Sequence, residues 1–189
     1  MTLKKSLLAT AAAATVAFSG FAYADDHGEN PMVGGAPMLE ERNIVENAMN
    51  SPIHTTLVAA VQAADLVATL QSEGPFTVFA PVDEAFAALP EGTVETLLMD
   101  ENKDMLVKVL TAHVVTGDIS AMDLMEGAAA SSDGFFHMET VSGDALSAQV
   151  RGDSVFIYDE SGNAGEVTIA DVDQSNGVIH VVDTVLLPE

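Results

Sequence analysis

Five glycines recur at nearly even intervals in the second half of the chain, and this spacing constrains the fold more than any other feature of the sequence. The glycines are Gly134, Gly143, Gly152, Gly162 and Gly177. The runs between them are rich in β-branched and apolar residues, at 146–150, 155–158, 167–172 and 178–187. Short strands divided by turn residues at this spacing are typical of antiparallel hairpins. We therefore predict a β-rich second half in which 159–163 forms a hairpin turn.

The part of the chain before these strands carries helix signals. Asn43 and Glu46 have the spacing of a capping box, which predicts the start of a helix. Apolar residues then recur at helical spacing over 57–70, 94–98 and 105–110. Helices that come first and strands that come later indicate an α+β domain.

One short strand is expected within this helical half. The segment 76–79 is aromatic and β-branched, which favours a strand buried on at least one face. Pro81 should end it, and Asp83 is expected to cap the short helix that follows.

The first 24 residues have the composition of a Sec-type signal peptide. Lys4 and Lys5 precede an apolar run over 7–21, and Ala22-Tyr23-Ala24 provides a small-residue cleavage site. A membrane anchor is the alternative, but the run is too short to cross a bilayer comfortably. No later segment is long and apolar enough to do so. We therefore expect a secreted or periplasmic protein without a membrane span.

A flexible acidic leader is expected at 25–38, before a single folded domain at 39–189. The leader is polar at its start and rich in glycine and proline at its end. If cleavage follows Ala24, the mature chain begins Asp25-Asp26-His27. The nitrogens of such a terminus can hold Cu(II) or Ni(II) in a square plane, which both metals prefer. The alternative is that these acidic residues only assist export.

The charge of the chain excludes some partners. Cleavage would remove two lysines and none of the 29 acidic residues, so the formal net charge would fall from −23 to −25. Such a surface repels nucleic acid and anionic lipid, and neither is expected as a partner. A salty habitat is an equally simple explanation of the acidity. The chain has no cysteine, so no disulfide stabilises it.

The sequence has none of the common catalytic motifs. It lacks a cysteine nucleophile, a Gly-x-Ser-x-Gly elbow, a His-Glu-x-x-His helix and a phosphate-binding glycine loop. After cleavage the firm cations would be Arg42, Lys103, Lys108 and Arg151, which is a poor set for binding phosphates. We therefore expect a non-enzymatic protein without a cofactor. An enzyme with an unrecognised carboxylate site remains the alternative.

Three segments, taken in order, resemble the signature segments of the fasciclin domain family. They are Gly74-Pro75-Phe76-Thr77-Val78-Phe79-Ala80-Pro81-Val82-Asp83-Glu84-Ala85-Phe86, Leu110-Thr111-Ala112-His113-Val114-Val115 and Asn176-Gly177-Val178-Ile179-His180-Val181-Val182-Asp183-Thr184-Val185-Leu186-Leu187-Pro188. The resemblance covers roughly 43–188 and is closest to small secreted single-domain fasciclin proteins of bacteria. It implies a wedge of two mainly antiparallel β-sheets with helices packed against it, and a role in adhesion or extracellular binding.

The resemblance also suggests candidate binding residues. The family usually has a tyrosine where this chain has Ala112, whereas His113 is retained. In animal relatives an aspartate and an apolar residue just before the last signature are implicated in integrin binding, and Asp171 and Val172 match them.

Two histidines in apolar contexts, His113 and His180, are further candidates. They could form a binding or switching pair, or each ring could fill a core site and hydrogen-bond locally. Both readings stay open at this point.

These observations favour a monomeric binding module for a protein or polysaccharide of the cell surface or matrix. The alternative from another class is a structural protein of the envelope without a defined ligand. An exposed apolar or aromatic patch would favour the binding module.

Overall fold

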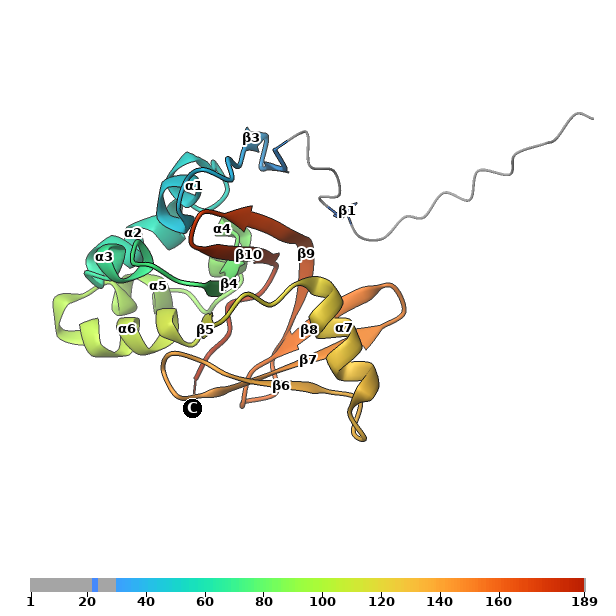
Figure 1. The fold of residues 1–189 in the computed structure, drawn as a ribbon. Helices are drawn as coiled ribbons and strands as arrows, with labels where there is room; N and C mark the ends of the chain where they lie inside the picture. Colours follow the sequence, from blue (N-terminus) through green and yellow to red (C-terminus); the bar gives the residue numbers. More distant parts are fainter. Residues whose placement is uncertain (1–21, 24–29, 189) are drawn as a thin grey trace, which may run out of the picture.

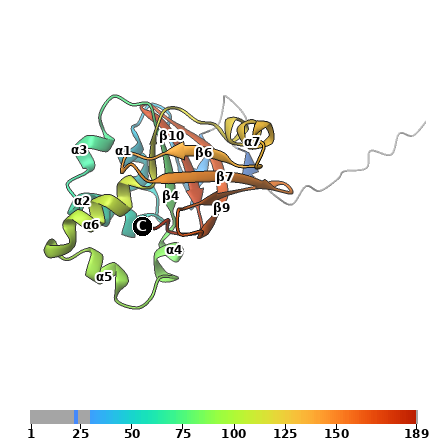
Figure 2. The same cartoon turned by 90° about the horizontal axis from the view of Figure 1, so that it is seen from below.

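The computed structural model of the protein describes residues 22–23 and 30–188 (Figure 1). The helices are α1 (Ile44–Asn50), α2 (Thr55–Ala63), α3 (Val67–Leu70), α4 (Asp83–Ala87), α5 (Thr93–Leu97), a 3₁₀ turn η1 (Asp100–Asn102), α6 (Lys103–Thr111) and α7 (Ala121–Ala130). The strands are β1 (Ala22–Tyr23), β2 (Met32–Val33), β3 (Ala36–Pro37), β4 (Phe76–Pro81), β5 (Val114–Thr116), β6 (Phe136–Glu139), β7 (Ala145–Arg151), β8 (Ser154–Tyr158), β9 (Ala164–Gln174) and β10 (Gly177–Val182). Helices α2, α3, α5 and α6 gather on one side of the strands, and α7 lies on the opposite side (Figure 2).

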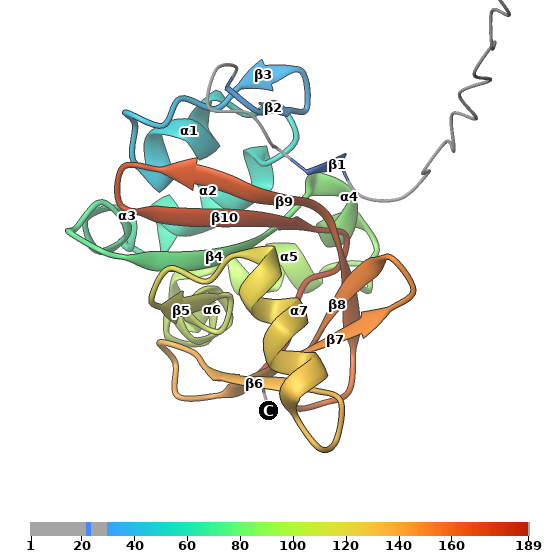
Figure 3. The ribbon, with the colours of Figure 1, turned by 45° about the vertical axis from the view of Figure 1, so that its right-hand side comes forward.

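One continuous path of strands runs in the order β5-β4-β10-β9-β8-β7-β6. Neighbours on this path are antiparallel except β4 and β10, which are parallel. Strand β9 bends between two layers, because residues 167–174 pair with β10 and residues 164–166 pair with β8 (Figure 3). The result is an α+β wedge of mainly antiparallel sheets, which confirms the predicted fold class.

The parallel pairing of β4 and β10 depends on a glycine. Gly177 has a φ of +148° and lies opposite Phe76 at the start of both strands. A Cβ atom at Gly177 would come within 1.9 Å of the Phe76 carbonyl oxygen. No other residue fits there without moving one of the two strands apart. The turn spacing in the sequence predicted hairpins but did not predict this parallel pair.

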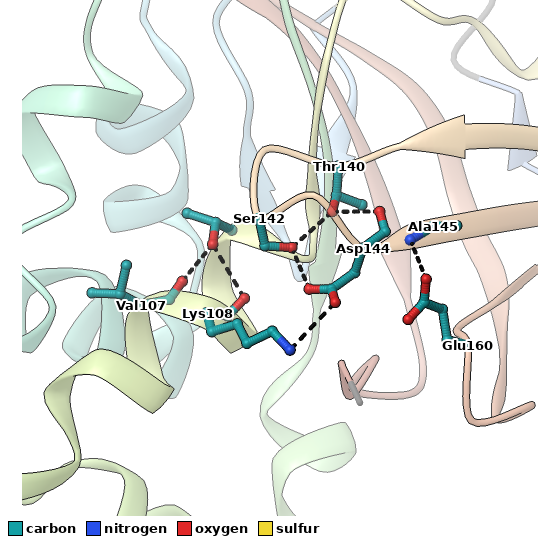
Figure 4. Close-up of polar contacts among 8 residues, drawn as sticks. Val107, Lys108, Thr140, Ser142, Asp144, Ala145 and Glu160 are labelled. Atoms are coloured by element: carbon teal, nitrogen blue, oxygen red, sulfur yellow. Dashed lines mark hydrogen bonds and ion pairs between the residues drawn. The ribbon is translucent and has the colours of Figure 1, made fainter.

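The two ends of the strand path nearly meet. A bridge pairs Val115 in β5 with Thr140, directly after β6. The turn that follows is held by hydroxyl groups: Ser142 Oγ donates to Asp144 Oδ2 over 2.6 Å, and Thr140 Oγ1 donates to the Asp144 carbonyl over 2.8 Å (Figure 4). An ion pair of 3.3 Å joins Lys108 of α6 to Asp144. The sheet is therefore tied to α6 where it comes closest to closing.

Two apolar cores lie on either side of β4 and β10. The first lies under the helices of the first half and includes Leu57, Leu70, Phe86, Leu106, Leu110 and Ile179. The second lies between the two sheet layers and under α7, and includes Phe79, Leu124, Leu146, Ile157, Val182 and Leu186. Successive residues of β4 and β10 face opposite cores, so these strands are buried on both sides.

The helix predicted over 57–70 is divided into two. Helix α2 ends at Ala63, and α3 begins at Val67. Between them Asp65 adopts a φ of +56°, a left-handed conformation that breaks the helical path. At the start of α1, by contrast, the predicted capping box between Asn43 and Glu46 is present in both directions.

Asp83 caps a different helix from the predicted one. It is the first residue of α4, and the residue before that helix is Val82. The Asp83 carboxylate accepts hydrogen bonds from the N–H of Thr56, at 2.8 Å, and from the N–H and hydroxyl of Thr55. It therefore caps α2, because the turn after β4 brings its side chain to the open end of that earlier helix.

Helix α7 lies before the predicted β-rich half, in a stretch for which the sequence predicted no element. Its N-terminus is capped by Ser120 and Asp123, which bond reciprocally in a capping box. Its apolar residues Ala121, Leu124 and Ala128 are buried in the space between the sheet layers.

Residues 30–38 pack on the domain, although the sequence predicted a flexible leader there. Strands β2 and β3 form a hairpin, and Val33 and Met38 are each 2 % exposed within the first core. The physical reason is that burying the apolar side chains of Val33 and Met38 against the first core stabilises the packed position of this segment. Residues 25–29, with the candidate metal terminus, lie outside the described residues, as does the signal peptide apart from Ala22–Tyr23.

Candidate functional site

His113 lies wholly inside the protein, between α6 and the C-terminal segment. Its Nδ1 lies 2.8 Å from the carbonyl oxygen of Val109, to which it donates, and its Nε2 accepts from the N–H of Leu186 over 2.9 Å. Burial lowers the pKa of His113 to about 4, against the opposing influence of the Val109 bond and the Asp159 charge. The ring is thus neutral and fastens the last turn of α6 to the chain end.

His180 is bonded in the opposite tautomer. Its Nε2 donates to the carbonyl of Ile119 over 2.8 Å, and its Nδ1 accepts from the N–H of Asp171 over 3.2 Å. The ring stacks on Phe79, with centroids 5.6 Å apart. Burial also lowers the pKa of His180, outweighing the Ile119 bond and the nearby Asp171 and Asp118 charges.

Asp171 and Val172 are framework residues in this conformation. Asp171 has a φ of +53°, and its Oδ1 accepts from the N–H of Ala121 over 2.7 Å at the start of α7. Val172 has no exposed surface. The structure brings Asp171 and His180 together. Asp171 Oδ1 and both ring nitrogens of His180 bond to backbone groups, two of which lie at the start of α7 or just before it. A ligand could reach Val172, His113 or His180 only if the fold opened.

Among residues 30–188, the aromatic residues outside the cores gather on the solvent side of β6–β8. In β8 the side chains of Val155 and Ile157 are buried, so Phe156 and Tyr158 face outward. We define the outer sheet face by its six residues, which come from β6, β7, β8 and the residue before β6: Phe135, His137, Gln149, Arg151, Phe156 and Tyr158.

These six side chains form one connected layer. The Cζ atom of Arg151 lies 5.5 Å from the ring centroid of Phe156 and 5.2 Å from that of Tyr158. Arg151 Nε donates to Gln149 Oε1 over 2.8 Å. Phe135 meets Tyr158 edge to face at 5.6 Å and stacks with His137 at 6.2 Å. The layer therefore offers aromatic rings beside a guanidinium held in place.

His137 is anchored at one end of this face. Its Nε2 lies 2.9 Å from Asp133 Oδ2 and its Nδ1 lies 2.8 Å from Ser147 Oγ. Hydrogen bonds from Ser131, His137 and the Phe135 N–H hold the pKa of Asp133 below its usual value. The sequence analysis missed the outer sheet face. The signal that could have found it is the alternation in β8, which places aromatic residues on the polar side of the strand.

Residues 52–188 match the model of the Fasciclin domain. The chain belongs to the fasciclin domain family. It is 49 % identical over 160 residues to Protein sll1483 of Synechocystis sp. (strain ATCC 27184 / PCC 6803 / Kazusa), and the match covers 85 % of this chain and 81 % of that protein. It is 36 % identical over 137 residues to the transforming growth factor-beta-induced protein ig-h3 of Sus scrofa, covering 70 % of this chain and 17 % of that longer protein.

A solved structure shares the fold. It is a FAS1 domain pair from the insect cell adhesion molecule fasciclin I, with a TM-score of 0.69 at 19 % identity. The match covers 77 % of this chain and 51 % of that one. At this identity the likeness concerns the fold alone.

The three fasciclin signature segments lie side by side. They contribute β5, β4 and β10, which are neighbours in the sheet. The N–H of Phe79 donates to the carbonyl of His113, and the N–H of Leu186 donates to the His113 ring. In this fasciclin domain the signatures therefore hold one another together.

No helix in residues 22–23 and 30–188 is long and apolar enough to cross a membrane. No group of three or more His, Asp or Glu side chains in the same residues could hold a metal ion.

Proposed function

We propose that this fasciclin domain protein is a secreted or periplasmic, monomeric adhesion module that binds a protein or polysaccharide of the cell surface or matrix and does no catalysis. The observation that carries the proposal is the outer sheet face, where three aromatic rings and Arg151 gather outside both cores. Contiguous patches of this kind mark interaction sites. Membership of the fasciclin domain family supports the same role, because the family resemblance implies adhesion or extracellular binding.

The burial of His113 and His180 argues against a catalytic role for these two side chains. A general acid or base must reach the proton that it transfers. His113 and His180 are buried and bonded to backbone groups through both ring nitrogens.

The test is retention of the exported protein on immobilised envelope and matrix fractions, at low and high salt. We expect saturable retention that Arg151→Ala weakens. Arg42→Ala is the matched control, because Arg42 is an exposed arginine outside the outer sheet face. Absence of retention on every fraction would favour the alternative of a structural envelope protein without a ligand.

Export is tested separately. Amino-terminal sequencing of protein recovered from the periplasm or the medium should begin at Asp25. Full-length protein confined to the cytosol would contradict this part of the proposal. Light scattering of the exported protein should give the mass of a monomer.

A further inference from the structure

We infer that the outer sheet face binds a neutral polysaccharide, with sugar rings packed against the aromatic side chains and sugar hydroxyls bonded to Arg151 and Gln149. This inference rests on the proposed adhesion function and names the chemical class of its partner.

The distribution of aromatic residues is the first argument. Among residues 30–188, Phe79 and Phe86 belong to the cores, and Phe76 and Phe136 pack against them. The three that remain, Phe135, Phe156 and Tyr158, all lie on the outer sheet face. These three side chains belong to neither core, so core packing does not explain why they are aromatic. Single exposed apolar residues need no explanation, but a gathered set points to a ligand.

The position of Arg151 is the second argument. The chain has 29 acidic residues, yet Arg151 forms no ion pair with any residue in 30–188. Its guanidinium lies over two aromatic rings, and Gln149 fixes its Nε. Rings attract a guanidinium and hold its plane at the surface. A guanidinium has five N–H donors in a fixed geometry, and only the Nε–H is used by Gln149. The N–H groups on the two terminal nitrogens therefore lie at the outer sheet face, where they can donate to a ligand.

The chemistry of a sugar fits this layer. A pyranose presents apolar C–H groups on its ring faces and hydroxyls around its rim. Aromatic rings, with their negative faces, suit the C–H groups. The planar side chains of Arg151 and Gln149 suit the hydroxyls, which both donate and accept hydrogen bonds. A repeating polymer would in addition contact several of the rings at once.

Charge selects a neutral polymer over an anionic one. Acidic side chains surround the face: Asp133 bonds to His137, Glu166 pairs with Phe156 across β8 and β9, and Asp153 lies in the turn after Arg151. Glu139 follows on the same side of β6 as His137. These carboxylates would repel uronic acids or sulfated sugars and outnumber the one arginine.

A protein partner is less well suited to this face. The centres of protein interfaces are rich in aromatic residues, arginine and methionine, and they are poor in aspartate and glutamate. The outer sheet face has the aromatic residues and the arginine, but it has no methionine and carboxylates lie around it. The exposed large aliphatic side chains of the described residues lie elsewhere: Met32, Met49, Leu98, Met99, Met105, Met122 and Val141. None of them belongs to the outer sheet face, which combines aromatic rings with polar groups.

Tyrosine emission provides a direct test. The chain has no tryptophan and two tyrosines, Tyr23 and Tyr158. In protein cleaved after Ala24, or carrying Tyr23→Phe, all tyrosine emission comes from the outer sheet face. The probes are dextran, mannan and a neutral galactan, with alginate as the anionic polymer. We expect a saturable change in emission with at least one neutral polymer and none with alginate.

Variants assign the binding to the face. We expect Arg151→Ala and Phe156→Ala each to weaken the binding by about tenfold, the loss of one favourable contact of this kind. Arg42→Ala should bind as the wild type does. Phe156 and Arg151 lie outside both cores, and unchanged thermal midpoints will show that their variants fold.

Three results would overturn the inference: no response to any neutral polymer, tighter binding of alginate, or unchanged binding by Arg151→Ala and Phe156→Ala. Treating the matrix fractions with periodate or with protease separates this inference from the proposed function. If protease treatment abolishes retention and periodate treatment does not, the partner is a protein. The proposed adhesion function would then hold, and the inference of a polysaccharide partner would be wrong. Retention absent from untreated fractions would refute the adhesion function itself.

Discussion

The N–H of Thr56, in the first turn of α2, donates a hydrogen bond of 2.8 Å to the carboxylate of Asp83, the first residue of α4. The same carboxylate accepts from the N–H and hydroxyl of Thr55. Asp83 thus satisfies the free amides of a helix 27 residues earlier in the chain. His54, which precedes α2, supplies no side-chain cap of its own.

Replacing Asp83 should therefore destabilise α2 rather than α4. We expect Asp83→Ala to lower the free energy of unfolding by about 1–2 kcal/mol, as the loss of a helix cap does. Urea denaturation measures the change, and hydrogen exchange should increase at Thr55 and Thr56. Asp83→Asn is the conservative variant and should lose less stability, because its single amide oxygen can still accept from the Thr56 N–H, whereas the bonds from Thr55 to the other carboxylate oxygen are lost. Faster exchange confined to α4 would contradict this assignment.

The buried histidines predict acid-sensitive stability. Burial is the main cause that lowers the pKa values of His113, His180 and His54, so each binds protons more readily in the unfolded chain. Their contribution to stability is complete above the unfolded pKa of about 6.5. For His113 it is lost as the pH falls through the folded pKa of about 4. The urea midpoint should therefore fall steadily from about pH 6.5 downward.

A variant of His113 tests the part of this effect that this residue contributes. His113→Gln should lower the midpoint at pH 7, since a glutamine cannot replace both the bond to the Val109 carbonyl and the bond from the Leu186 N–H. It should also make the midpoint less dependent on pH between 6.5 and 4. An unchanged slope would show that other groups govern the acid response. Asp83 acts at lower pH than the histidines. Burial raises its pKa, but the hydrogen bonds from Thr56 and Thr55 together lower it by more, so the folded pKa lies below the unfolded value of 3.8. Its contribution to stability is therefore lost only below about pH 3.8.

Two core substitutions should be severe. Phe79 is fully buried in the second core, and Ile179 is 5 % exposed in the first. We expect Phe79→Ala and Ile179→Ala each to cost about 2–5 kcal/mol in denaturant unfolding. Met105→Ala is the control, because this side chain is 59 % exposed and should change stability by less than about 0.5 kcal/mol. Wild-type midpoints for both core variants would refute the burial of these strands.

The mature amino terminus should bind copper in solution. If cleavage follows Ala24, one equivalent of Cu(II) should bind through the terminal amine, backbone nitrogens and the His27 imidazole. Calorimetric titration should show this site lost in His27→Ala, and also in protein with one extra residue before Asp25. Equal binding by either altered protein would exclude the site.

Local features of this protein could be predicted from its sequence. The capping box of Asn43 and Glu46, the turn at 159–163 and the burial alternation of β8 depend on residues a few positions apart. In the turn, the N–H of Asp159 donates to the carbonyl of Asn163, as its sequence indicated. The three fasciclin signatures also predicted the α+β wedge, because they include the strands at its centre.

Only the tertiary structure decided which distant segments meet. The parallel pairing of β10 with β4, the bond from Thr56 to Asp83 and the burial of Met38 each join parts of the chain that no local pattern connects. The outer sheet face likewise needs the register of β7 against β8, which places Gln149 opposite Phe156. Local preferences act over a few residues, whereas register and packing are set by the balance of burial over the whole core. For that reason His113 and His180 could be named from the sequence, but their roles as backbone acceptors and donors inside the fold could not.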